Sequence, residues 1–259
     1  MKEARAHGSS PSMRSLTLSQ LLHISDSALP IGSASHSFGL ETLVADGALT
    51  PADLKGFFAD FLVESGALEG AGCLTAYRIA SARETGEQRP PGISGELLTA
   101  QGWSEWLNLN CRMSARRAPR ESRDASSTLG RRFLKLLLEI IPNVGLRSAM
   151  DAASRAGVKI HHCTAFGLVG GSLDLGAEET TLACIQQTLK TLISACQRLL
   201  PLGQVAANAL LWNLQSDLID CLERVRSDVN SGSLTPCFTP MLEMASMRHP
   251  LLSTRLFIS

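Results

Sequence analysis

Apolar residues recur at spacings of three and four along most of this chain, which is the period of a helix with one buried face. The clearest stripe follows Thr50–Pro51, a pair typical of a helix N-terminus, and consists of Leu54, Phe57, Phe58, Phe61 and Leu62. Further helical stretches are predicted at residues 69–83, 95–118, 120–141, 147–156, 161–173, 178–200 and 203–226. No segment of useful length alternates apolar and polar positions, as a half-buried strand does. The pattern predicts an all-α, single-domain bundle of about eight to ten helices.

The two ends of the chain differ from this helical body. Residues 1–15 are polar and lack the apolar stretch of a signal peptide, so we expect a disordered leader followed by a helical domain at 16–259. Within that domain, residues 84–95 contain two prolines and three glycines and are expected to form a surface loop. Residues 230–259 contain further prolines and a short apolar ending, and they form a separate tail.

Charge and composition exclude several classes of partner. Lysine plus arginine and aspartate plus glutamate number 24 each, so no net field attracts the protein to nucleic acid or to an anionic membrane. Aromatic residues make up only 5% of the chain, which also argues against binding nucleic acid by base stacking. The most apolar stretch, 133–141, is too short to span a membrane. Seven scattered cysteines without a CxxC pair favour a reducing compartment, and we expect a cytoplasmic protein.

Sequence motifs for catalysis and cofactor binding are missing from the full sequence. No lysine follows a glycine, which excludes a GxxxxGKS/T phosphate loop and therefore a P-loop GTPase. GxGxxG, HExxH and GxSxG are also absent, and no pair of carboxylates suited to acid–base work shares a predicted helix face. We therefore expect that the protein is not an enzyme and needs no cofactor.

His161, His162 and Cys163 form the one cluster of metal-ligating residue types. Neighbouring residues on a helix point about 100° apart, so a single ion would need ligands from elsewhere in the chain. A packing or interface role for the two histidines is favoured over metal binding. A metal-dependent hydrolase that uses this cluster together with Glu41 is the enzymatic alternative.

Two further patterns allow both a structural and a functional interpretation. Gly167, Gly170 and Gly171 lie in one apolar helix, where glycine lowers stability unless another backbone approaches closely, and tight helix packing is the favoured explanation. A basic stretch forms either a solvated helix face or a docking surface for an acidic partner. Its members are Arg112, Arg116, Arg117, Arg120, Arg123, Arg131 and Arg132.

The segment SDSALPIGSASHSFGLE, which begins at Ser25, contains a turn signal between two predicted helices. Pro30 and Gly32 favour the turn, and Ser35 or Ser37 can cap the helix that follows. The LPxG and HSFGLE strings of this segment resemble the N-terminal signature of the UreF family.

Four more strings resemble the same family and occur in the same order. The first two are RESR and GRRFL between Arg120 and Leu134, and HH and FG between His161 and Gly167. The other two are RL and PLGQ between Arg198 and Gln204, and the ending from His249 to Ser259. Ala34 departs from the pattern, because the family usually has Phe or Tyr there. The residues that would form the turns of such a protein are Pro30, Gly32, Gly39, Pro201 and Gly203.

The resemblance implies a non-catalytic urease accessory protein that is all-α and dimeric. Proteins of this family act as a scaffold or chaperone that binds a second accessory protein, UreD (UreH in some species), on apo-urease. The pair recruits or gates UreG, the GTPase that carries nickel for insertion and urease maturation, and a tunnel through the pair is one proposed nickel route. The resemblance leaves open whether UreG is activated or restrained and whether nickel contacts this chain. A helical adaptor without urease partners is the alternative.

The residues that the resemblance assigns to partner binding lie in the signature and in the tail. They are His36, Ser37, Phe38, Glu41, Arg255, Leu256 and Phe257. An apolar tail with one arginine fits an anchor that folds on binding, because its apolar side chains stay exposed until a groove covers them. The tail can instead dock back on its own core. Glu41 can instead serve as a favourable charge in the first turn of a helix.

Overall fold

The computed structural model of this chain describes residues 13–82, 98–141, 144–232 and 237–259. Most of the expected leader lies outside these ranges, as do the expected loop at 84–95, Pro142 and Pro236. Among the described residues no strand occurs, so the predicted all-α fold is confirmed. In chain order the elements are α1 (Met13–Ile24), η1 (Ser33–Ser35), α2 (Leu40–Ala45), α3 (Leu54–Phe61), the π-helical η2 (Leu62–Gly66), α4 (Ala67–Ser81), α5 (Ala100–Ala115), α6 (Arg120–Ile140), α7 (Val144–Ala156), α8 (His162–Ser172), α9 (Ala177–Leu199), α10 (Gln204–Asn213), α11 (Gln215–Asn230), α12 (Pro240–Arg248) and η3 (His249–Leu251).

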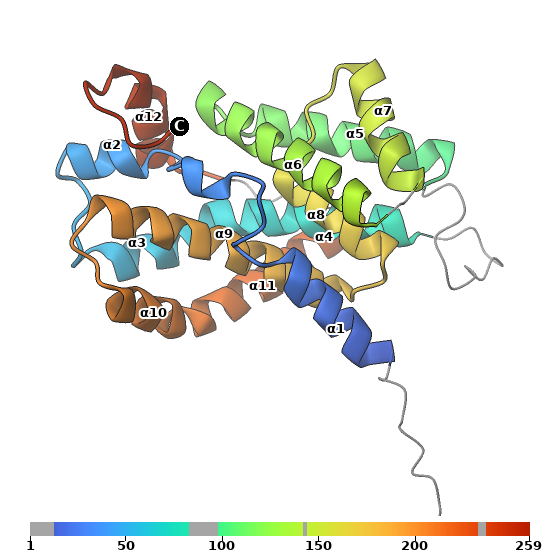
Figure 1. The fold of residues 1–259 in the computed structure, drawn as a ribbon, viewed down its shortest axis with the longest axis horizontal. Helices are drawn as coiled ribbons and strands as arrows, with labels where there is room; N and C mark the ends of the chain where they lie inside the picture. Colours follow the sequence, from blue (N-terminus) through green and yellow to red (C-terminus); the bar gives the residue numbers. More distant parts are fainter. Residues whose placement is uncertain (1–12, 83–97, 142–143, 233–236) are drawn as a thin grey trace, which may run out of the picture.

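Helix α8 forms the centre of the fold. All of its residues from Cys163 to Ser172 are buried, and α4, α6 and α9 pack around it (Figure 1). A helix that is apolar all round is typical of such a central position. Phe166 of α8 stacks on Phe133 of α6, with ring centroids 5.4 Å apart. Trp106 of α5 donates its indole N–H to the carbonyl oxygen of Thr164 at 3.3 Å.

The glycines of α8 let two helix backbones meet. A Cβ atom on Gly167 would lie 2.0 Å from the carbonyl oxygen of Cys73, and one on Gly171 would lie 2.5 Å from that of Tyr77. No side chain fits at either position without moving the α4 backbone. The structure therefore confirms the tight packing predicted for these glycines.

Two element boundaries differ from the sequence pattern. The stretch expected to be one helix from residue 203 to 226 is divided into α10 and α11 at Leu214. Helix α3 begins at Leu54, because residues 51–53 form a turn in which the Asp53 carboxylate accepts from the amide and the hydroxyl of Thr50 at 2.9 and 2.6 Å.

The N- and C-terminal elements lie in different parts of the molecule. Helices α2 and α12 pack side by side at one end, next to the C-terminus, whereas α1 extends from the body farther down (Figure 1). In the described part of the chain, no helix is both long enough and apolar enough to cross a membrane.

Candidate functional site: a tail docked on the N-terminal turn

The N-terminal strings identified in the sequence form a compact turn, here called the signature turn and defined as residues 29–41. Gly32 and Gly39 adopt φ angles of 84° and 94°, a region that favours glycine. A Cβ on Gly39 would lie 2.8 Å from the carbonyl oxygen of Leu242 in α12, so this glycine also allows α12 to approach. Pro30 precedes η1, and Pro201 and Gly203 lie in the connection between α9 and α10.

The prediction that a serine caps the helix after this turn is wrong. Helix α2 has Gly39 at its N-cap position, and no side chain accepts a hydrogen bond there. The Ser37 hydroxyl instead donates to the backbone oxygen of Ser259 at 3.0 Å. A contact with the far end of the chain has taken the place of the local cap.

The last part of the expected tail, residues 249–259, docks along the signature turn, and from here on these residues alone are called the tail. The backbone oxygen of Ser259 accepts from the amides of Ser37 and Phe38 at 2.5 and 3.2 Å. His36 Nδ1 and the Ser259 hydroxyl are 2.8 Å apart, and the Ile258 amide donates to the Ser35 carbonyl at 2.9 Å. His36 and Ser37 are buried by these contacts.

Glu41, in the first turn of α2, binds the tail at a second point. Its Oε2 accepts from His249 Nε2 at 2.7 Å and from the Phe257 amide at 3.2 Å, and its Oε1 accepts from the Leu256 amide at 2.5 Å. Burial alone would raise the pKa of Glu41, but the hydrogen bonds from Leu256, His249 and Phe257 together lower it below its ordinary value. The carboxylate therefore stays ionised at neutral pH and holds the tail in place.

Arg198, at the end of α9, completes the docking site. Its guanidinium carbon lies 4.3 Å from the centre of the Phe257 ring, and its Nη1 donates to the Ala34 carbonyl at 2.6 Å. No partner-binding role was expected for Arg198, His249 or Ser259. Arg198 stands in one string that resembles the family, and His249 and Ser259 stand in another, which was the available signal.

The docked tail has a buried side and an exposed apolar side. Phe257 is 4% exposed and packs on the core of the chain, which is one of the two placements considered from the sequence. Leu251, Leu256 and Ile258 are 82%, 54% and 69% exposed. The neighbouring α12 adds three exposed methionines and a preceding phenylalanine: Met241, Met244, Met247 and Phe238.

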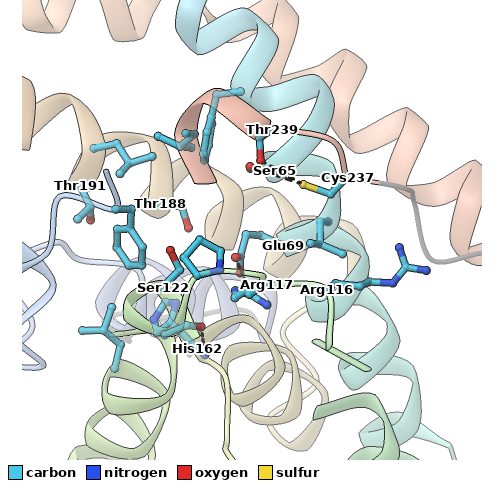
Figure 2. A pocket seen from close by; sticks show the side chains of 18 of the residues that line it. Ser65, Glu69, Arg116, Arg117, Ser122, His162, Thr188, Thr191, Cys237 and Thr239 are labelled. Carbon is cyan, nitrogen blue, oxygen red and sulfur yellow. Dashed lines mark hydrogen bonds and ion pairs between the residues drawn. The ribbon is translucent and has the colours of Figure 1, made fainter. Parts of the chain in front are cut away.

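A partly open cavity of about 120 Å³ lies next to the start of α12, and Glu69, Arg117, Cys237 and Thr239 are among the residues that line it (Figure 2). Arg117 and Glu69 form an ion pair in its wall. Cys237 and Thr239, which precede α12, line it together with residues of the signature turn such as Phe38. The cavity therefore lies between the signature turn, α12 and helices of the core.

His161 and His162 have different surroundings and do not meet on one ligand. Both ring nitrogens of His161 lie within hydrogen-bond distance of serine hydroxyls, those of Ser114 and Ser126, at 2.8 and 3.1 Å. Burial lowers the pKa of His161 to about 3 and that of His162 to about 4, so both rings are neutral at physiological pH. The His162 ring packs against Phe133, with centroids 5.6 Å apart, and its Nε2 is buried without a hydrogen-bond partner.

The residues needed for the hydrolase alternative are not brought together. Both carboxylate oxygens of Glu41 are occupied by the tail, and burial raises the pKa of Cys163 well above its ordinary value, so the thiol stays protonated. Across the described ranges no group of three His, Cys, Asp or Glu side chains could hold a metal ion.

Together these features define an all-helical protein whose C-terminal tail docks on the signature turn and leaves apolar side chains exposed. A sequence model of the UreF family matches residues 49–215. Two urease accessory proteins UreF, from Trichormus variabilis and from a Nostoc species, are each 30% identical to this chain over 241 residues, covering 92% of this chain and 94% of the relative. A third, from a Picosynechococcus species, is 30% identical over 251 residues, covering 95% and 100%. The chain belongs to the UreF family of urease accessory proteins.

Proposed function

We propose that this chain is a non-catalytic scaffold of urease maturation that binds a UreD/UreH-type accessory protein through the docked tail and α12. The assembly sits on apo-urease and recruits or gates a UreG-type GTPase for nickel insertion, and the chain forms a homodimer within it. Family membership supports the role in urease maturation. The docked tail, with its exposed apolar side chains, supports the place of contact.

The exposed side of the tail is the observation that carries this proposal. Leu251, Leu256 and Ile258 are in contact with water in the isolated chain, and several large exposed apolar side chains on one short segment favour a protein interface. Methionines on α12 add flexible side chains that adapt to the shape of a partner. Glu41 binds the Leu256 and Phe257 amides of the tail, and His36 contacts the Ser259 hydroxyl. The surface is therefore ordered before a partner arrives, and less conformational entropy is lost on binding.

The interior favours a scaffold over an enzyme. Glu69 and Arg117 neutralise each other in the cavity wall. The pKa of His161, lowered to about 3, makes this ring a weak base toward the Ser114 and Ser126 hydroxyls that it contacts. The wall therefore has polar groups that contribute to packing but lacks an activated nucleophile–base pair among the described residues.

Urease maturation in cells tests this function. The urease genes of the source are expressed with the other accessory genes, once with the full chain, once without it and once with residues 249–259 deleted. We expect urease activity and nickel per urease subunit to be high only with the full chain, at equal amounts of urease protein. Full activity and nickel content without the chain would contradict the proposed function.

A further inference from the structure

Some side chains of the basic stretch found in the sequence are held by partners within the chain, and others line a groove. Arg117 is buried against Glu69, and Arg120 pairs with Asp124 at 3.4 Å. Arg123 donates from its Nη1 to two backbone carbonyls, both at 2.5 Å, just after α5. These three arginines therefore have structural roles and do not form a general basic surface.

The remaining basic groups in α6 line a groove. Arg131, Arg132 and Lys135, together with Thr128 and Met150, surround a volume of about 250 Å³ between α6 and α7. The four α6 residues are spaced i, i+3, i+4 and i+7, which places them on one face of the helix. All three cationic side chains are exposed. In the part of the chain that the structure describes, no carboxylate forms an ion pair with any of them.

Three neighbouring cations that form no ion pair repel one another and attract an anion. The guanidinium group binds carboxylate oxygens in pairs, and the Thr128 hydroxyl offers one more donor. The backbone amides of this stretch lie in the middle of α6 and are used within the helix, so the groove lacks the backbone donors of a typical phosphate site. The charged stripe from Arg131 to Lys135 extends for roughly 6 Å along the helix, a length that suits two successive carboxylates on one peptide.

We propose that this groove binds an acidic segment of a partner protein, with carboxylates held by Arg131, Arg132 and Lys135. The groove is separate from the apolar tail, and this proposal does not depend on the proposed function. It borders the signature turn, because Arg132 Nη1 donates to the Ile31 carbonyl at 3.3 Å. A Cβ on Gly32 would lie 2.4 Å from the same nitrogen, so the turn and the groove share a wall.

Fluorescence anisotropy with the full chain tests this proposal. The probe is a labelled peptide of alternating glutamate and glycine, and a peptide of glutamine and glycine is the neutral reference. The double variant Arg131→Gln/Lys135→Gln removes two groove charges, and Arg155→Gln/Lys190→Gln removes two exposed charges elsewhere. We expect the first variant to bind the acidic peptide about tenfold more weakly and the second to stay within about twofold of the unmodified chain. Binding should weaken as salt is added.

Three results would overturn the proposal. Equal binding by the groove variant and the unmodified chain would show that the groove is not the site. Equal weakening by both variants would show an effect of overall charge. Displacement of the peptide by inorganic phosphate or tripolyphosphate at lower concentration than by free acidic peptide would identify a phosphate site instead. Circular dichroism of each variant checks that the helical fold is kept.

Discussion

At the scale of single residues, Glu41 joins segments that are far apart in the sequence. Its partners His249, Leu256 and Phe257 stand 208, 215 and 216 positions away along the chain. One carboxylate thus orders the tail by accepting a side-chain and two backbone donors. Glu41 lies in the first turn of α2, where a negative charge favours a helix end, and it supports the segment that we propose faces the partner.

Replacing Glu41 by Gln should loosen the tail. The amide keeps one oxygen acceptor but turns an NH₂ group toward a buried N–H donor, which should lower the free energy of unfolding by about 1–3 kcal/mol. Hydrogen exchange at the Leu256 and Phe257 amides measures the effect directly, and faster exchange is expected. Glu139→Gln, at an exposed position of α6, is the matched control and should leave that exchange unchanged.

The same contact has a predictable pH dependence. The pKa of Glu41 is lower in the folded protein than its ordinary value of 4.5. The ionised carboxylate therefore stabilises the docked tail fully above pH 4.5, and this stabilisation is lost as the pH falls through the lowered pKa. Protection of the tail amides should therefore persist from pH 7 to pH 5 and fall below pH 4.5. Glu41→Gln should lack this acid step, and a step of equal size in the variant would show that another group controls the tail.

At the scale of elements, the periodic helices could be predicted from the sequence and the irregular boundaries could not. The stripe around Phe58 marks α3 because its apolar spacing is local information. The division between α10 and α11 at Leu214 has no proline or glycine to announce it. The start of α2 at Leu40, with Gly39 as its N-cap, escaped prediction because the serine expected as a cap bonds to Ser259.

The backbone contact between α4 and α8 leads to an element-scale prediction. Gly167→Ala should lower the free energy of unfolding by about 2–4 kcal/mol, although alanine is the better helix former, because its Cβ would collide with the Cys73 carbonyl. A Cβ on Gly56 in α3 would meet nothing within 4 Å. Gly56→Ala should therefore raise the free energy of unfolding by roughly 0.5–1 kcal/mol. Urea unfolding of both variants measures the difference, and an equal effect at the two sites would contradict the close backbone packing.

At the scale of the whole molecule, three of the five family-like strings converge on one place. The signature turn, Arg198 and the tail lie far apart in the sequence but touch in the structure. The sequence indicated their importance but not their contact, because pairing across more than 200 positions leaves no local period. His161 and His162 show the opposite case, in which neighbours in the sequence do not share a site. The ring of His161 contacts the Ser114 hydroxyl, whereas that of His162 packs against Phe133.

The central claim is that the exposed apolar side of the tail and α12 binds the UreD/UreH-type partner. Copurification of that partner with the tagged chain tests it most directly, using Leu251→Asp/Ile258→Asp on the tail and Val205→Asp, at an 84% exposed position of α10, as the control. The unmodified chain and the control should retain the partner in equal amounts. The tail variant should lose most of it while its circular dichroism stays unchanged. Full retention of the partner by the tail variant would contradict the account.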